Sequence, residues 1–377
     1  MKSDLFQRLA AWRHHLHAYP EISCQERATA AFVCEKLAEM GIPFTAGIGG
    51  HGVVATLTRG VSNRSTGLRA DMDALPVLEA PGRVYGSRNP GVMHACGHDG
   101  HTVSLLGAAA LLLEDPSWSG TVQCIFQPAE EGLGGAQAML DDGLLERFPC
   151  ERIFGYHNWP GLEAGVVMVH AGPVMAAAAS FNITLRGVAG HAAMPHACAD
   201  PVQGLAHLII ALNAIVARNV DPQEAAVIST CTLKAGEANN LIAPEAALGG
   251  TIRALTPKMM HFLQARVREV AEHTARAHDL TARVEITGEV AATINHAAEA
   301  ALAAQAAADA GLSLRGDLKP SMAGEDFGRF LEVMPGAYAW IGNGASAGLH
   351  NEAYDYNDEI LPVAARYYAA VARAALA

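Results

Sequence analysis

The sequence has few charged residues and few cationic ones in particular. Charged residues make up 17% of the 377 residues, and 38 aspartates and glutamates outnumber 26 lysines and arginines. The net charge of −12 argues against nucleic acid as a partner, because polyanions are bound through surplus positive charge. It does not argue against a small acidic substrate, since a local cationic site can lie in an acidic protein.

Long apolar runs and a disulfide framework are also missing. The longest apolar stretches, such as residues 103–113, fall well short of the ~20 residues that a membrane span requires, so no membrane partner is expected. The seven cysteines are odd in number and scattered, which fits a reducing, cytoplasmic compartment. Residues 1–17 predict an amphipathic helix rather than a signal peptide, because Arg and His interrupt the apolar residues.

The length and the apolar content together predict two folded domains. The chain is too long for one ordinary core, and 51% of its residues are hydrophobic. The first half alternates helix-like and strand-like runs, which predicts an α/β sheet covered by helices. The predicted helices are 5–17, 26–40 and 103–114, and the predicted strands are 51–57, 66–70, 121–126 and 152–155.

From about residue 180 the pattern changes to the order β-α-β-β-α-β. Asp200-Pro201 predicts the start of a long helix, as an N-cap followed by a first-turn proline. This order is the ferredoxin-like unit, and it predicts a small α+β domain inserted into the larger one. We therefore expect a catalytic domain in two parts, 1–179 and 292–377, with an inserted lid or dimerisation domain at 180–291. The elements predicted in the insert are 181–186, 200–218, 226–233, 246–254, 257–278 and 282–287, and the larger domain is expected to end with a strand at 338–341 and a helix at 362–375.

The most informative motif is MHACGHDGH at residues 93–101, taken together with QPAEE at 127–131. The first places a thiol, three imidazoles and a carboxylate in nine residues, and the second places two adjacent carboxylates after a predicted strand. Soft and borderline ligands beside hard carboxylates are typical of a transition-metal hydrolytic site.

Candidate side chains follow the predicted strands at one edge of the sheet. Asp71 and Asp73 follow strand 66–70, residues 127–131 follow strand 121–126, His157 follows strand 152–155, and His350 lies in the loop after strand 338–341. In open α/β sheets, ligands bind beyond the carboxyl ends of the strands. This placement therefore predicts one shared site.

These residues suit metal-assisted hydrolysis. If the segment is extended, Cys96 and His98 face the same side and reach one metal or bridge two. Glu130 and Glu131 are adjacent and point in different directions, so that one binds metal while its neighbour stays free as a base. A water between two cations about 3.5–4 Å apart has a lowered pKa and a fixed direction of attack.

Each residue alone has a simpler interpretation. A single histidine among 17 is more often a surface or hydrogen-bonded core residue, a lone Cys96 is a small buried hydrophobe, and an isolated Glu130-Glu131 pair is a solvated loop. The joint pattern favours a metal site formed by residues in glycine-rich, turn-like settings, namely Cys96, His98, Glu131, His157 and His350.

These motifs resemble the dinuclear metallopeptidase superfamily of aminoacylases and related carboxypeptidases. The closest likeness is to its amidohydrolase branch, with hippurate hydrolases, N-acyl-amino-acid amidohydrolases and auxin-conjugate hydrolases. The matching segments run in order over nearly the whole chain: LHAYPEIS (16–23), RADMDALP (69–76), MHACGHDGHT (93–102), FQPAEEG (126–132), YHNWPGL (156–162), GHAAMPH (190–196), GTIRAL (250–255), AGEDFG (323–328) and GLHNEAYDYND (348–358).

The resemblance implies a role for each matching residue. Glu130 matches the catalytic base, Asp73 matches a carboxylate that orients a ligand or the base, and His191 matches an oxyanion donor that often acts across a dimer interface. The five residues of the predicted metal site match the ligands of two divalent ions per subunit, which are Zn, Mn, Ni or Co. The inserted domain is expected to act as a lid and to form a homodimer or higher homo-oligomer.

The substrate expected from the resemblance is a small N-acyl amino acid, which carries a free carboxylate. Arg253 and Asn240 are the candidates to bind that carboxylate, and a structural ion pair is the alternative role for Arg253. The predicted reaction is metal-dependent hydrolysis of the amide bond of N-acyl or N-aroyl amino acids such as hippurate. A dipeptidase or carboxypeptidase with the same metal core is one alternative, and a non-catalytic metal-dependent binding protein is another.

Overall fold

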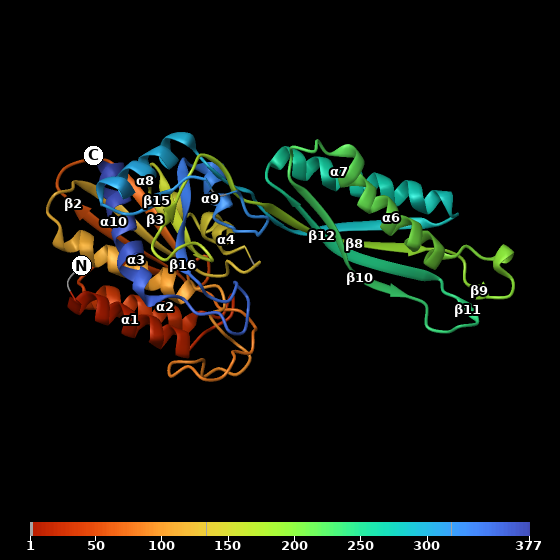
Figure 1. Ribbon diagram of the computed structural model, residues 1–377, viewed down its shortest axis with the longest axis horizontal. Coiled ribbons are helices and arrows are strands. Elements are labelled where there is room, and N and C mark those ends of the chain that lie inside the picture. The colour runs from red at the N-terminus through yellow and green to blue at the C-terminus, as the bar shows by residue number, and fades with distance from the viewer. Residues whose placement is uncertain (1–2, 133, 318) are drawn as a thin grey trace. The chain divides into compact units, whose positions relative to one another are not determined.

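The computed structural model describes residues 3–132, 134–317 and 319–377. Its contacts divide the chain into two compact units (Figure 1). The first unit runs up to Val174 and continues through Ile294–Lys319 and Asp326–Ala377. The second unit comprises Met175–Thr293 and Pro320–Glu325. The chain thus leaves the first unit, builds the second, and returns.

The first unit is built on an eight-stranded sheet. Its strands lie in the order β1 (Phe44–Ile48), β2 (Gly52–Arg59), β4 (Gly120–Gln127), β3 (Ser65–Asp71), β5 (Ile153–Pro160), β16 (Gly336–Gly344), β6 (Val167–Met168) and β15 (Leu314–Arg315). The central strands β4, β3, β5 and β16 are parallel, whereas β1 and β2 are antiparallel additions. The carboxyl ends of the four central strands therefore meet at one edge, as the sequence predicted.

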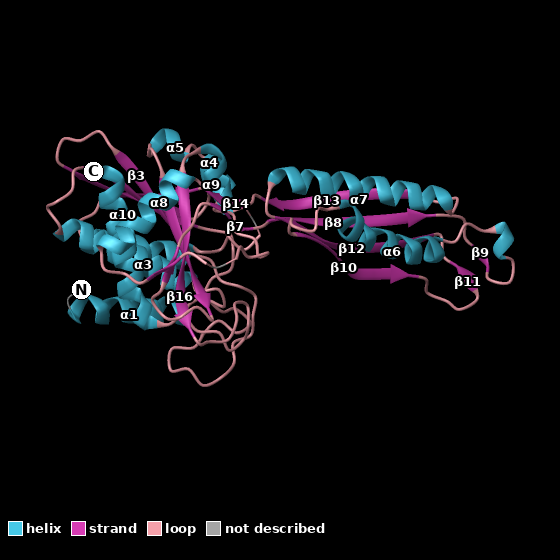
Figure 2. Ribbon diagram, turned by 45° about the horizontal axis from the view of Figure 1, so that its top comes forward, coloured by secondary structure: helices cyan, strands magenta, loops and turns pink. Residues whose placement is uncertain are grey.

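Helices cover both faces of this sheet (Figures 1 and 2). Helices α3 and α10 pack on one face, and α4 and α9 lie on the other. The helices of the unit are α1 (Ser3–Ala18), α2 (Arg27–Glu39), α3 (His98–Glu114), α4 (Gly135–Asp141), α5 (Leu144–Arg147), α8 (Ala297–Asp309), α9 (Gly328–Val333) and α10 (Leu361–Leu376), with a short 3-10 turn at Asp358–Ile360. This architecture confirms the predicted α/β class.

Helix α3 lies between the sheet and other helices, which explains why it is apolar around its whole circumference. Nearly all of its residues are buried, and Leu105, Leu106 and Leu112 are fully inaccessible. The predicted start of this helix at Val103 was wrong, because the helix begins at His98. Its first turn is polar and serves the site, so the apolar period starts only after it.

The second unit has a ferredoxin-like four-stranded antiparallel sheet with two helices. The strand order is β10-β12-β8-β13, which is the order expected for a β-α-β-β-α-β unit. The elements are β8 (Ala177–Arg186), α6 (Pro201–Asn219), β10 (Ala226–Ala235), β12 (Glu245–Ala254), α7 (Pro257–Ala277) and β13 (Thr281–Val290). A short ribbon pairs β9 (Gly190–His191) with β11 (Leu241–Ile242), and a 3-10 turn at Pro195–Ala197 follows β9 in the chain. A second short ribbon pairs β7 (Gly172–Met175) with β14 (Thr293–Asn295).

The long helices of this unit start where the sequence predicted. The Asp200 carboxylate accepts a hydrogen bond from the Val202 N–H, and Pro201 occupies the first turn of α6. The segment Pro320–Glu325 groups with this unit, whereas the sequence pattern assigned all of 292–377 to the larger domain. The reason is local pairing, since the Ala176 N–H donates to the carbonyls of Ser321 and Ala323.

Helix α6 is amphipathic but apolar on both sides. Leu205, Leu208 and Leu212 are buried against the rest of the unit, whereas Ile210 is 70% exposed. Helix α6 is therefore not fully buried within its unit. Among the described residues, α6 alone has the length and hydropathy of a membrane span, which is weak evidence for one because a core helix of a water-soluble domain has the same properties.

Candidate metal centre

A tight turn brings Cys96 and His98 together. Gly97 adopts a left-handed conformation with φ of 91° and caps α3, so His98 is the first residue of the helix. The predicted extended geometry of this segment was therefore wrong. A side chain at Gly97 would bring its Cβ within 2.3 Å of the Asn158 amide nitrogen, so only glycine fits here.

The five predicted ligands lie together in overlapping groups. The ligand atoms of each group lie within 4.8 Å of one another. One group is Cys96, His98 and His157, and a second is Cys96, Glu131 and His350. Cys96 belongs to both, and its Sγ lies 3.3 Å from the His157 Nε2. The sequence predicted that His157 follows its strand. It lies within β5 instead, because that strand extends to Pro160.

The two buried histidines present the same ring nitrogen to the centre of the cluster. His98 Nδ1 lies 3.3 Å from an Asp73 carboxylate oxygen, and His157 Nδ1 lies 2.6 Å from the Asn158 carbonyl. In the neutral form of each ring these oxygens accept the Nδ1–H, so the Nε2 atom carries the free lone pair, as in histidines that bind metals. The buried His98 Nε2 and Glu131 Oε1 have no hydrogen-bond partner among the described residues. Buried lone pairs that accept no hydrogen bond fit a bound cation.

The loop after β4 places its two carboxylates differently. Glu131 Oε1 lies 3.3 Å from the His350 Nε2, and the Glu131 N–H donates to Asp73 at 3.0 Å. Glu130 Oε1 instead accepts the Asp326 N–H at 3.3 Å, while its Oε2 lies 4.0 Å from the His98 Nε2. The adjacent glutamates differ in these partners, although both lie 4.0 Å from the His98 Nε2 and group with it by distance.

Negative charge accumulates at this centre. Although burial opposes it, the neighbouring carboxylates of Asp71 and Asp73 raise the pKa of His98 to about 10. Burial, followed by the charges of Glu131 and Glu130, raises the pKa of the Cys96 thiol well above its usual range. A concentration of carboxylates that stabilises one positive charge so strongly also attracts divalent cations.

His101 and Asp71 were not given ligand roles by the sequence, and the hydrogen bonds explain what they do. His101 Nδ1 lies 2.6 Å from Asp71, and its Nε2 accepts the Asn158 N–H at 3.0 Å. Both ring nitrogens are thus occupied, although His101 groups with Asp71 and His98 by distance. The interval of three residues between His98 and His101 on a helix was the available signal. Buried Arg69, which pairs with both Asp71 and Asp326, was missed.

The candidate substrate residues all lie in the second unit. His191 is exposed on β9, opposite Leu241 of β11, and the Asn240 carbonyl accepts the Ala192 N–H at 3.1 Å. His191 and Asn240 are therefore neighbours. Arg253 lies half-buried on β12, where its Nε donates to the Thr251 hydroxyl, and no carboxylate within the described ranges pairs with it. Burial lowers the pKa of its guanidinium.

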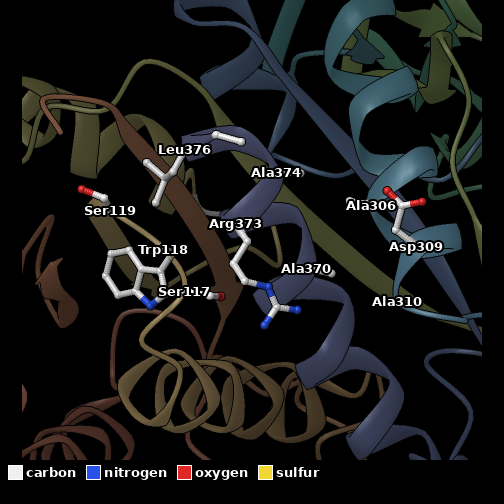
Figure 3. Close-up of a pocket in the computed structure, with 11 residues that line it drawn as sticks. Ser117, Trp118, Ser119, Ala306, Asp309, Ala310, Ala370, Arg373, Ala374 and Leu376 are labelled. Carbon is white, nitrogen blue, oxygen red and sulfur yellow. The ribbon is translucent and has the colours of Figure 1, made fainter. Parts of the chain in front are cut away.

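A cavity of about 550 Å³ lies at the opposite edge of the sheet (Figure 3). It is lined where β4 begins and where α10 ends, by residues that include Trp118, Asp309 and Arg373. None of the clustered cysteine, histidine or glutamate ligands lines it. The cavity therefore has no part in the metal centre.

A largely buried cluster of cysteine, histidine and carboxylate side chains at the carboxyl edge of a largely parallel sheet defines a metal-dependent hydrolase. A model of peptidase family M20/M25/M40 matches residues 67–374. The chain belongs to this family, and it is a metal-dependent amidohydrolase.

Three comparisons place the chain within the family. It is 40% identical to a hippurate hydrolase of Campylobacter jejuni, over 98% of this chain and 97% of that one. It is 37% identical to an N-acetyl-L-cysteine deacetylase of Bacillus subtilis, over 97% and 87% of the two chains. The solved structure of the Bacillus subtilis YXEP protein, described as a dinuclear metal-binding peptidase of the M20 family, matches with a TM-score of 0.89 and 31% identity over 100% and 99% of the chains.

Proposed function

We propose that this protein hydrolyses the amide bond of N-acyl or N-aroyl amino acids, such as hippurate, to a carboxylic acid and a free amino acid. The observation that carries the proposal is the position of Glu130 beside the five clustered ligands. The names of the relatives, a hippurate hydrolase and an N-acetyl-L-cysteine deacetylase, agree in acting on acylated amino acids.

The cofactor in this proposal is a pair of divalent metal ions. Cys96, His98, Glu131, His157 and His350 would hold them, and their mixed sulfur, nitrogen and oxygen donors suit Zn, Mn, Co or Ni. When bound, the ions would supply an activated water and polarise the scissile carbonyl. Asp73 orients two of these ligands, because one of its oxygens contacts the His98 Nδ1 and the other accepts the Glu131 N–H.

In this mechanism the protein's own residues move the proton and bind the substrate. Glu130 accepts the proton of the attacking water and passes it to the departing amine. His191 donates a hydrogen bond to the oxyanion of the tetrahedral intermediate. Arg253 binds the substrate carboxylate with the help of Asn240, and the lack of a carboxylate partner within the described residues leaves the Arg253 guanidinium available for it.

A substrate panel with controlled metal content tests the proposal. Metal-stripped protein, restored in turn with Zn, Mn, Co or Ni, is assayed with benzoylglycine, acetyl amino acids, benzoylglycinamide and free dipeptides. We expect metal-dependent cleavage of the acyl amino acids and at least about 100-fold weaker kcat/KM for the amide, because it lacks the carboxylate that pairs with Arg253. Product formation by chromatography is the measurement.

Other results of the panel would identify a different function. Cleavage of free dipeptides alone would establish the dipeptidase or carboxypeptidase alternative, which the description of YXEP as a peptidase favours. Tight metal binding without turnover of any of these substrates would point to the non-catalytic binding protein. Equal turnover of benzoylglycine and its amide would contradict the role of Arg253.

The second unit is proposed to act as a lid and as the surface of a homodimer. The outer face of α6 exposes Val202 and Ile210, and β10 is an edge strand. An exposed apolar face beside an unpaired strand edge is typical of a two-fold interface. A cytoplasmic location completes the proposal, since the seven cysteines are all free.

Replacing Ile210 by lysine is expected to convert the dimer to a monomer. The side chain is 70% exposed, so the change does not disturb the interior of the unit but places a charge in the proposed interface. Sedimentation velocity measures the result, with Val61→Lys, at a 97% exposed position of the first unit, as the control that stays dimeric. A wild-type protein that sediments as a monomer would contradict the dimer.

A further inference from the structure

Glu26 is a buried carboxylate that the mechanism above does not use. It has no exposed surface, although it stands at the start of α2, where side chains usually cap their own helix. Glu26 makes no such capping bond. Its Oε1 instead accepts the Ala129 N–H at 2.8 Å and the Cys24 N–H at 3.0 Å, while its Oε2 has no hydrogen-bond partner among the described residues.

Ala129 is the residue directly before the proposed base, and its backbone is strained. Its φ is +54°, a left-handed conformation that residues with a side chain rarely adopt. The Ala129 carbonyl accepts the Gly135 N–H at 3.0 Å, and the Glu130 carbonyl accepts the Gly132 N–H at 2.6 Å. Such strain persists only where the surroundings hold it, and it concentrates at functional sites.

Two carboxylates hold the backbone on either side of Glu130. Glu26 binds the N–H of Ala129, and Asp73 binds the N–H of Glu131. The segment that carries Glu26 also fastens Asp73, because the Ser23 hydroxyl donates to Asp73 at 2.6 Å. The third contact is made to the side chain itself, where Glu130 Oε1 accepts the Asp326 N–H.

We propose that Glu26 is a positioning residue for the hydrolytic reaction, because it holds Ala129 in its left-handed conformation and so aims the Glu130 carboxylate at the substrate. The inference rests on the proposed function, in which Glu130 is the base. Glu26 touches neither the ligands nor the reacting atoms and acts through the backbone alone. Substitution of Glu26 therefore lowers kcat, with KM and metal content unchanged.

Steady-state kinetics of benzoylglycine hydrolysis by metal-saturated protein test this role. Glu26→Ala is expected to lower kcat about 100-fold, the effect of misplacing a catalytic group by about 1 Å. Glu26→Gln keeps an oxygen acceptor for the Ala129 N–H and is expected to lose no more than about tenfold, since a neutral acceptor forms a weaker bond. Glu26→Asp, which keeps the charge but shortens the reach, should resemble the alanine variant and replaces it if that variant does not fold.

The matched control is Glu21→Ala. Glu21 also accepts a backbone N–H, that of Thr29 at 2.8 Å, but it makes no hydrogen bond to residues 128–132. Its loss is expected to lower the melting temperature and to leave kcat near the wild-type value. An unchanged kcat in Glu26→Ala, an equal loss in Glu26→Gln, or a loss that follows metal content would overturn the positioning role.

Amide hydrogen exchange of the metal-free protein gives a readout that needs no substrate. The Ala129 N–H is expected to exchange faster in Glu26→Ala than in wild type, Glu26→Gln or Glu21→Ala. If the Ala129 N–H exchanges faster in Glu26→Ala but the wild-type protein cleaves no acyl amino acid, Glu26 does hold Ala129 and the proposed function is wrong. If the wild-type protein cleaves acyl amino acids, but Glu26→Ala changes neither the exchange of the Ala129 N–H nor kcat, the proposed function stands and the positioning role of Glu26 is wrong.

Discussion

Replacing Glu130 by alanine is expected to lower kcat for benzoylglycine by several orders of magnitude, about 10³-fold, and to leave metal binding largely intact. The reason is that the two adjacent glutamates have different proposed roles, with Glu131 as a metal ligand and Glu130 as the general base. Glu131 lies 3.3 Å from His350 and shares a ligand group with it and Cys96, whereas Glu130 is held by the Asp326 N–H. A general base contributes about 10²–10⁴-fold to turnover.

Metal content and turnover have to be measured on the same samples. Mass-spectrometric metal analysis after dialysis should give the wild-type content for Glu130→Ala and a reduced content for Glu131→Ala, which serves as the contrasting variant. Glu130→Gln keeps the shape of the side chain and should be as inactive as the alanine variant, because an amide does not accept the proton of water. Unchanged activity in Glu130→Ala, or loss of its metal, would show that the base was assigned wrongly.

The sequence predicted the fold well because its signals are local and periodic. The Asp200-Pro201 pair predicted the start of α6, and the strand-like runs predicted a sheet whose carboxyl ends carry Asp71, Gln127 and the later candidates. It failed where a single residue changes direction. Gly97, with its left-handed φ, starts α3 five residues before the apolar period does and removes the extended geometry assumed for Cys96 and His98.

The parts of the site that could not be predicted depend on contacts between distant segments. Glu26 meets Ala129 across 103 positions, and Asp326 meets Glu130 across 196. Neither contact has a periodicity or spacing of its own, so nothing in the neighbouring residues indicates it. The same holds for His101, whose occupied ring nitrogens exclude it as a ligand only after the positions of Asp71 and Asn158 are known.

Replacing Cys96 by serine is expected to reduce the binding of both metal ions and to abolish turnover. Cys96 is the residue shared by the group with His98 and His157 and the group with Glu131 and His350. A serine hydroxyl has nearly the same shape, but it is a much weaker ligand than a thiolate. Loss of an outer partner of a metal ligand alone costs about 10–100-fold in affinity, so losing the shared ligand should cost more than about 100-fold.

Metal titration by calorimetry and metal content after dialysis measure this effect, with Cys124→Ala as a control at a burial-matched position. Cys124 is fully buried in β4 and belongs to no ligand group among the described residues, so its replacement removes a buried thiol without touching the centre. Loss of one equivalent alone from Cys96→Ser would assign the thiol to a single ion. Retention of both ions at wild-type affinity would remove Cys96 from the ligand set, and the pairing of His98 with His157 would then have to be completed by carboxylates.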